Sequence, residues 1–283
     1  MKMGADKRPG LGLALGGGGA RSLAHIGILK VFEQEGIQVN YLTGASMGGM
    51  IAAASAAGLS AVEIEAVALR MTHLRQLIHL IDIAPFQRGI ISGKHVRQLI
   101  TDIIGVERTF TDLRIPLALT ATDLARGRLV LLRAGSLVDA VLATCTVPGL
   151  WPPVQIGDTL LVDGGLYNNI PVDIARQMGA EIVIALDAAP HFPKDESSPG
   201  NEYPQALPGV VPDFLEDFYQ AMMILSDLLT HKQLEDAPPD LLLQPKLAED
   251  ISLFAFHRAA EIISAGEAAA RSALPDVQYL LRG

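Results

Sequence analysis

A serine at position 46 has the surroundings of an activated nucleophile. Residues 44–48, GASMG, form a G-x-S-x-G pattern between a predicted strand and a predicted helix. A sharp strand-to-helix turn exposes the serine hydroxyl, and glycines at Gly44 and Gly48 avoid clashes that a Cβ would cause. The start of the helix also directs free N–H groups toward the serine. This context predicts that Ser46 is a nucleophile rather than only a helix cap.

A run of four glycines, Gly16–Gly19, ends the first predicted strand and is followed by Ala20 and Arg21. Acyl transfer forms a tetrahedral oxyanion, and backbone N–H groups of consecutive glycines can donate to it. A nucleotide-phosphate loop is the rival interpretation. However, a G-x-G-x-x-G pattern started at Gly16 requires glycine where Arg21 stands, and the Gly-Lys-Ser/Thr ending of a P-loop is absent. The run is therefore interpreted as an oxyanion loop.

The base that activates the serine has two candidates. Asp163 precedes two glycines at the end of a predicted strand, where its carboxylate can be exposed beside the serine. An aspartate in this position is also a common turn residue. His191 follows Asp163 in the Ser…Asp…His order of α/β-hydrolases. Against His191, Ser46 comes after only two predicted strands, earlier than in that fold.

The elements that must position these residues alternate between strands and helices, which predicts an α/β fold with a mostly parallel sheet covered by helices on both faces. Strands are expected at 11–15, 39–43, 115–123, 128–133, 159–162, 181–187 and 241–244, and helices at 20–35, 50–57, 92–104, 136–143, 171–178, 213–234 and 256–274. Ser60 and Glu63 form a capping box for one more helix.

The chain is expected to be a single domain over residues 1–283. Residues 190–212 contain six prolines and are predicted to form a long loop. Residues 213–283 then form a C-terminal helical part that packs on the same domain. The sequence shows no internal repeat and no second core.

Composition excludes several classes of function. The net charge of -9 disfavours nucleic-acid binding and gives no general attraction to anionic lipid. Cys145 is the only cysteine, which excludes an internal disulfide and a cysteine-cluster metal site. No grouping has metal-ligand spacing, so neither a metal nor a cofactor is expected.

The location of the protein is expected to be cytoplasmic. The polar N-terminus has no apolar stretch of signal-peptide length. Residues 36–62 carry no charge, but glycines and small alanines interrupt them, so they are not expected to span a membrane. Any contact with a membrane would be peripheral, local and apolar.

Together these motifs resemble the patatin-like phospholipase family, a serine–aspartate dyad fold. The resemblance also includes TVPGLWPPV at 146–154 and NNIPV at 168–172, and it extends to 250–274. It implies a three-layer patatin-like architecture. Ser22 is a departure, because family members often have glycine after the arginine.

Residue by residue, the resemblance implies that Ser46 attacks an ester carbonyl and that Asp163 takes its proton. The oxyanion hole that it implies comprises Gly17, Gly18, Gly19 and Met47. The supporting residues that it implies are Arg21, which would brace the glycine loop, and Gly44, Gly48, Gly164 and Gly165.

The implied activity is hydrolysis of a fatty-acyl ester, usually a phospholipid or lysophospholipid, through an acyl-enzyme. Two alternatives stay open: a catalytically silent regulatory or scaffold protein of the same fold, and an esterase or acyltransferase for small soluble esters. Residues 214–229 carry apolar side chains near i, i+4 spacing, which could contact lipid, cover an acyl pocket, or pack in the core or a dimer.

Other reactive residues have structural interpretations. Cys145 is expected to be a small packed residue and His25 a packing or capping residue. Asp123 and Asp187 are expected in turns. Trp151 could line an acyl pocket or pack in the core.

Overall fold

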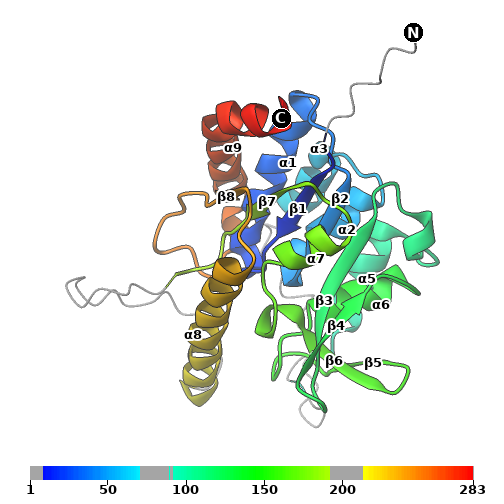
Figure 1. Cartoon of the computed structure of the whole chain (residues 1–283). Coiled ribbons are helices and arrows are strands. Elements are labelled where there is room, and N and C mark those ends of the chain that lie inside the picture. The colour runs from blue at the N-terminus through cyan, green and yellow to red at the C-terminus, as the bar shows by residue number, and fades with distance from the viewer. Residues whose placement is uncertain (1–8, 71–88, 90–91, 192–212, 283) are drawn as a thin grey trace.

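The structure, a computed structural model, describes residues 9–70, 89, 92–191 and 213–282. They form an eight-stranded sheet with helices on both faces (Figure 1). The strand order is β5-β6-β3-β2-β1-β7-β8, and β4 also pairs with β3. This architecture confirms the predicted α/β class with a mostly parallel sheet.

The strands are β1 (Leu11–Leu15), β2 (Tyr41–Gly44), β3 (Leu117–Asp123), β4 (Arg128–Leu132), β5 (Val154–Ile156), β6 (Thr159–Asp163), β7 (Ile182–Leu186) and β8 (Leu241–Leu243). The α-helices are α1 (Ala24–Gln34), α2 (Ser46–Ala56), α3 (Ala61–Arg70), α5 (Lys94–Ile104), α6 (Leu137–Thr144), α7 (Val172–Gln177), α8 (Asp213–Asp236) and α9 (Ala259–Arg282). Short 3-10 helices cover Gly19–Leu23, Phe110–Asp112, Gly164–Leu166 and Phe256–Arg258.

The centre of the sheet is parallel and buried on both faces. β1 pairs in parallel with β2 and β7, and every residue of β1 and β7 is buried. Strands that are buried on both faces have continuous apolar sequences, as β1 does with LGLAL. Because the strands are parallel, the segments that follow β1, β2 and β7 emerge at the same edge of the sheet.

Two strands run toward each other along one side of β3. β2 is parallel to β3 and ends with Gly44 opposite Leu119, whereas β6 is antiparallel and ends with Asp163 opposite Ala121. β4 occupies the other side of β3. The carboxyl ends of β2 and β6 therefore face each other, and this brings the residues after β2 close to the end of β6.

The two faces of the sheet carry cores of different size. The larger core joins Leu11, Leu13 and Leu15 to residues of α1, α2, α6 and α9. The smaller core joins Ala14, Val183 and Ala185 to residues of α7. Figure 1 shows α7 on one face of the sheet and α1 and α9 on the other.

Most predicted elements are present, with shifted ends. The helix predicted at 20–35 begins as a 3-10 helix, the one predicted at 50–57 begins at Ser46, and the one predicted at 92–104 begins at Lys94. The hairpin of β3 and β4 and the capping bonds between Ser60 and Glu63 are confirmed.

Two elements differ from the prediction. Strand β5, which pairs with β6, was not expected. Helix α9 was expected to end at Leu274, but it continues through Pro275 to Arg282. Proline usually interrupts a helix, yet here the following turn places Val277 in the core, and its burial favours continuation.

The sequence also predicts a proline-rich loop and no membrane-spanning segment. Residues 192–212, most of the predicted proline-rich loop, lie outside the described residues. Among the helices that the structure describes, none is both long enough and apolar enough to cross a membrane.

Candidate active site

Ser46 lies on a strained turn between β2 and α2. Its φ is 51°, and it is the one non-glycine residue with positive φ in the described part of the chain. Such strain is maintained only where the surroundings enforce it. A Cβ on Gly44 would lie 2.8 Å from the Cα of Gly49, and one on Gly48 would collide with the carbonyl of Gly16. These glycines are therefore needed because backbone segments approach each other closely.

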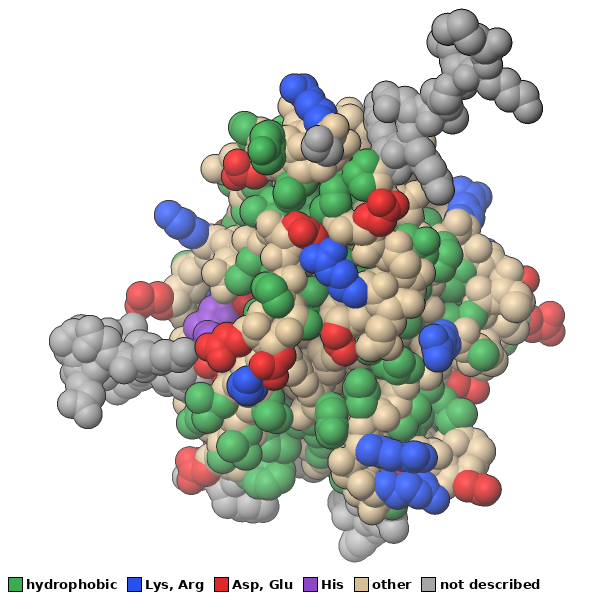
Figure 2. Space-filling view, in the orientation of Figure 1, with side chains coloured by type: hydrophobic (Ala, Val, Ile, Leu, Met, Phe, Trp, Pro, Cys, Tyr) green, Lys and Arg blue, Asp and Glu red, His purple; other side chains and the backbone are tan. Residues whose placement is uncertain are grey.

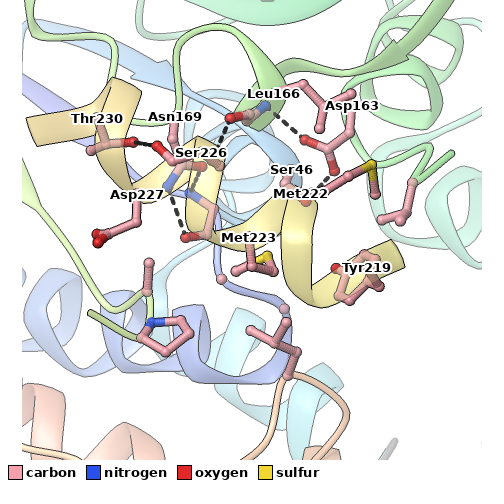
Figure 3. Close-up of a pocket in the computed structure, with 18 of the residues that line it drawn as sticks. Ser46, Asp163, Leu166, Asn169, Tyr219, Met222, Met223, Ser226, Asp227 and Thr230 are labelled. Carbon is pink, nitrogen blue, oxygen red and sulfur yellow. Dashed lines mark hydrogen bonds between the residues drawn. The ribbon is translucent and has the colours of Figure 1, made fainter. Parts of the chain in front are cut away.

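The hydroxyl of Ser46 donates a hydrogen bond to Oδ2 of Asp163, with an Oγ–Oδ2 distance of 2.6 Å (Figure 3). The other carboxylate oxygen, Oδ1, accepts from the N–H of Gly165 at 2.7 Å. The Ser46 N–H donates to Oγ1 of Thr144 at 2.9 Å, which holds the start of α2. The serine and the aspartate therefore meet directly, as the facing ends of β2 and β6 require.

Asp163 is buried, with only 7% of the residue exposed. Burial raises its pKa to about 6, although the bonds from Ser46 and Gly165 favour the charged form. No positively charged side chain is among its hydrogen-bond or ion-pair partners in the described structure. Asp163 is thus ionised at neutral pH and more basic than an ordinary aspartate, which suits it to accept a proton.

Ser46 and Asp163 line a pocket. Gly17, Gly18 and Gly19 of the glycine loop line the same pocket. The N–H of Gly17 is not available to a ligand, because it donates to Oδ1 of Asn169 at 3.1 Å. This differs from the oxyanion role expected of Gly17. In the described structure, the N–H groups of Gly18, Gly19 and Met47 have no hydrogen-bond partner, and these three stay candidates.

Other expected supporting residues also contact this region. Arg21 donates from Nε to the carbonyl of Ala188 at 2.8 Å and from Nη1 to that of Ile251 at 2.9 Å. It therefore ties the glycine loop to the segments after β7 and before α9. A Cβ on Gly164 would collide with the carbonyl of Thr120, and one on Gly165 would lie 2.8 Å from Oδ1 of Asn169.

His191 lies at the pocket but bonds elsewhere. Its Nε2 is 2.8 Å from Oδ2 of Asp187, and its Nδ1 is 3.0 Å from Oδ1 of Asp227. The bond with Asp187 is the main cause that raises its pKa to about 9, so the ring is protonated at neutral pH. None of the hydrogen bonds described for Ser46 or Asp163 goes to a histidine. His73 and His79 lie outside the described residues.

The fold also forms a cluster that sequence spacing did not indicate. Donor atoms of His191, Asp227 and His231 lie within 4.8 Å of one another, as in a metal site. The ion pairs of His191 with two carboxylates account for this arrangement without a metal ion.

Helix α8 covers the pocket with one side. Tyr219, Met222, Met223, Ser226 and Thr230 line the cavity, and Figure 3 shows them on the same helix beside Ser46 and Asp163. The hydroxyl of Ser226 donates to the carbonyl of Gly165 at 2.7 Å, and Gln233 donates to the carbonyl of Tyr167. These bonds fix the helix over the residues that follow Asp163.

The opposite side of α8 exposes large apolar side chains: Phe218, Ile224, Leu225, Leu228 and Leu229. Figure 2 shows hydrophobic side chains gathered where α8 lies. The predicted i, i+4 stripe is thus divided, since Met222 lines the pocket while Phe218, Leu225 and Leu229 face outward. The side chain of Phe214 lies outside the described residues.

Several residues of the site gave no usable signal in the sequence. Asn169 lies in the NNIPV block but had no expected role. Thr144 lies just before the TVPGLWPPV block and Tyr219 lies within residues 214–229, but neither had an expected role. The structural interpretation of two other residues, Asp123 and Cys145, agrees with the fold. Asp123 accepts turn bonds from Ala125 and Arg126, and burial raises the pKa of the Cys145 thiol. Trp151 does not border the pocket.

Comparisons with known proteins agree with this arrangement. Residues 13–176 match the family model described as patatin-like phospholipase. An uncharacterized NTE family protein of Mycobacterium tuberculosis is 29% identical over 83% of this chain and 63% of its own length. The human patatin-like phospholipase domain-containing protein 6 is 34% identical over 68% of this chain and 14% of its own length. The chain thus spans less than two thirds of the length of these relatives.

The fold has neighbours among solved structures. VipD of Legionella pneumophila superposes with a TM-score of 0.53 at 14% identity, over 96% of this chain and 67% of that one. ExoU of Pseudomonas aeruginosa, solved in complex with SpcU, superposes with a TM-score of 0.50 over 98% of this chain and 54% of that one. At 14% identity these likenesses concern the fold alone. Because the family model covers more than half of the 283 residues, the chain belongs to the patatin-like phospholipase family.

Proposed function

We propose that this chain is a serine acyl hydrolase that cleaves fatty-acyl esters of lipids, as a phospholipase A or lysophospholipase does. Ser46 forms the acyl-enzyme and Asp163 is the base. The observation that carries the proposal is the 2.6 Å hydrogen bond from the Ser46 hydroxyl to a buried carboxylate that lacks a cationic partner in the described structure.

Acylation follows from this geometry. Oγ of Ser46 attacks the ester carbonyl while its proton passes to Oδ2 of Asp163. The carbonyl oxygen becomes an oxyanion, which the N–H groups of Gly18, Gly19 and Met47 stabilise. The tetrahedral intermediate then collapses, the C–O bond to the alcohol breaks, and protonated Asp163 returns its proton to the leaving oxygen.

Deacylation repeats these steps with water. Asp163 accepts a proton from water as the water oxygen attacks the acyl carbon, and the same N–H groups bind the second oxyanion. Collapse breaks the bond to Ser46 Oγ, which takes the proton back from Asp163. The products are a free carboxylic acid and an alcohol, and no co-reactant other than water is needed.

The lipid part of the proposal is supported by the pocket wall. Val147, Pro148, Leu166, Leu253 and three residues of α8, namely Tyr219, Met222 and Met223, line the cavity around Ser46. Such a lining favours an acyl chain over a polar substituent. Methionine side chains also adapt to chains of different shape.

Labelling with a fluorophosphonate probe tests the catalytic part. Wild-type protein should be labelled at Ser46, whereas Ser46→Ala should not be. Ser55→Ala changes a serine on the same helix and is the matched control, so it should be labelled like wild type. Absence of labelling in folded wild-type protein would favour the catalytically silent alternative.

Comparison of ester chain lengths tests the lipid part. The proposal predicts a higher kcat/KM for long-chain lysophospholipids than for acetyl or butyryl esters. If the short soluble esters were preferred, the chain would be an esterase or acyltransferase of small substrates.

We also propose that the exposed side of α8 contacts the surface of a lipid bilayer. The support is that this helix lines the substrate pocket with one side and exposes Phe218, Leu225 and Leu228 on the other. Since the net charge is -9, contact is expected with uncharged, zwitterionic vesicles. Leu225→Asp should reduce hydrolysis in phosphatidylcholine vesicles without changing that of a soluble ester, and Val106→Asp, on another exposed apolar residue, should change neither. Equal vesicle activity in both variants would contradict the contact.

A further inference from the structure

Most backbone N–H groups of the glycine loop, Gly16–Arg21, donate to other groups of the protein. The N–H of Gly16 donates to Leu186, that of Ala20 to Leu253, and that of Arg21 to Gly18. The N–H of Gly17 donates to the Asn169 side chain. Within the loop as the structure describes it, only Gly18 and Gly19 have N–H groups without a partner.

The peptide between Gly16 and Gly17 is held on both sides by side chains. Its carbonyl oxygen accepts from Nε2 of His25 at 2.8 Å and from Oγ of Ser22 at 3.1 Å. Its N–H donates to Oδ1 of Asn169 at 3.1 Å. All three side chains are buried, with His25 and Ser22 at 0% exposure and Asn169 at 8%. Asn169 also donates from Nδ2 to the carbonyl of Gly17 at 3.4 Å.

The protonation of His25 follows from its partners. Burial lowers its pKa to about 4, so the ring is neutral at neutral pH and carries one N–H. A carbonyl oxygen only accepts, so the proton must be on Nε2. In the described structure Nδ1 is buried and has no partner, as expected of the unprotonated nitrogen in an apolar site. His25 is therefore a fixed donor, not a base.

We infer that Ser22, His25 and Asn169 are positioning residues, which fix the orientation of the Gly16–Gly17 peptide so that the N–H groups of Gly18 and Gly19 remain available for the oxyanion. This inference rests on the proposed function. A peptide without side-chain restraint can rotate, and glycines offer little steric resistance to rotation. Three buried hydrogen bonds would make rotation costly, because each buried group would lose its partner.

Ser22 makes the inference specific to this chain. A glycine at this position could not donate to the Gly16 carbonyl, whereas the Ser22 hydroxyl does. Here the hydroxyl shares that carbonyl with His25. Ser22 therefore adds a hydrogen bond that restrains the glycine loop and does not loosen it.

Kinetics of a soluble ester, p-nitrophenyl butyrate, test the inference with paired variants. His25→Leu and Asn169→Ala should each lower kcat by about 10- to 100-fold, less than the ~10²–10³ that loss of an oxyanion donor costs. KM should stay within about three-fold, because the ground-state carbonyl binds these N–H groups weakly. His25→Gln, whose amide can still donate to Gly16, should restore most of kcat.

Asn40→Ala is the matched control for Asn169→Ala. Asn40 also accepts a backbone N–H, that of Leu11 at 2.9 Å, but at the opposite end of β1. A role limited to stability predicts equal losses of melting temperature with unchanged kcat in both variants. A positioning role predicts loss of kcat in Asn169→Ala alone. Unchanged kcat in both His25→Leu and Asn169→Ala would overturn the inference.

Amide hydrogen exchange and histidine NMR give a readout that does not depend on activity. The Gly17 amide should be protected and those of Gly18 and Gly19 unprotected, and Gly17 protection should be lost in Asn169→Ala. The His25 ring should show a proton on Nε2 and none on Nδ1 at neutral pH. A His25 ring protonated on Nδ1 would overturn the inference. If these signals are as expected but wild-type protein hydrolyses no ester, the proposed function fails while the loop geometry stands.

Discussion

Two buried aspartates lie near the glycine loop: Asp163 lines the same pocket as Gly17–Gly19, and Asp187 follows Leu186, whose carbonyl accepts from the N–H of Gly16. Asp163 ends β6, and Asp187 follows β7; their exposures are 7% and 2%. Burial pushes the pKa of both upward. For Asp163 burial prevails, and the pKa rises to about 6. For Asp187 the hydrogen bond and charge of His191, with Gln244 and Ala189, outweigh burial and lower the pKa.

The difference teaches that the partner, and not the depth of burial, decides what each carboxylate can do. Asp163 faces a neutral hydroxyl and can take its proton. Asp187 faces a protonated imidazole and is committed to an ion pair. The histidine that could have completed a triad is therefore held by the aspartate that is not the base.

The largest expected effect comes from exchanging the carboxylates for amides. Asp163→Asn should lower kcat by about 10⁴-fold, and Ser46→Ala by at least as much, because each removes a reacting group. Asp187→Asn should lower kcat by less than about ten-fold, since the amide oxygen still accepts from Ala189. Circular dichroism should show that all three variants are folded. Comparable losses in Asp163→Asn and Asp187→Asn would break the distinction between the two carboxylates.

A substitution on the side of the loop that faces Ser46 should have the next largest effect. A Cβ on Gly17 would lie 2.9 Å from the Ser46 Cβ and 2.6 Å from Oδ1 of Asn169. Gly17→Ala should therefore lower kcat by ~10²–10³, as misplaced oxyanion donors do. Gly10→Ala, whose Cβ would meet nothing closer than 3.4 Å, is the control and should keep wild-type activity. Turnover of a soluble ester and thermal unfolding measured together separate loss of function from loss of fold.

The pH profile of kcat/KM shows whether Asp163 or His191 is the catalytic base. A base acts when deprotonated, so an Asp163 enzyme should lose activity as pH falls through about 6. A His191 enzyme should lose it already as pH falls through about 9. His191→Ala should leave the acid limb of the kcat/KM profile near pH 6 and change the acylation rate by less than about ten-fold. A neutral ester and a parallel circular-dichroism titration exclude substrate ionisation and acid unfolding. A limb near 9 that disappears in His191→Ala would establish a triad.

The smallest effect concerns stability. The pKa of His191 is raised to about 9 in the folded protein, against about 6.5 in the unfolded chain. The contribution of protonated His191 to the free energy of unfolding is therefore fully present below about pH 6.5 and is lost as pH rises through about 9. Among the described residues, the groups that contact His191 include Asp187, Asp227, His231 and Gln244. Because its side chain is 36% exposed, the contribution should not exceed about 1 kcal/mol, or about 2 °C in melting temperature. The difference between wild type and His191→Ala should be larger at pH 7 than at pH 10. An equal difference at both values would show that lost packing, not charge, is the cause.

Local patterns in the sequence already determined much of this protein. The apolar run of β1, the glycines around Ser46, and the hairpin of β3 and β4 depend on neighbouring residues. Short-range sterics and burial therefore suffice to predict them. The family resemblance, carried by such motifs, was confirmed by the match over residues 13–176.

Only the tertiary structure decided which distant groups meet. Ser46 and Asp163 are 117 positions apart, and their contact depends on the antiparallel direction of β6 along β3, which no local pattern indicated. Gly17 and Asn169 are 152 positions apart, and their bond changed which N–H groups are available. The inner and outer sides of α8 likewise carry similar apolar residues, and only docking over the pocket distinguishes them. The physical reason is that strand order and direction are set by burial summed over the whole sheet, whereas a sequence motif reports only its own surroundings.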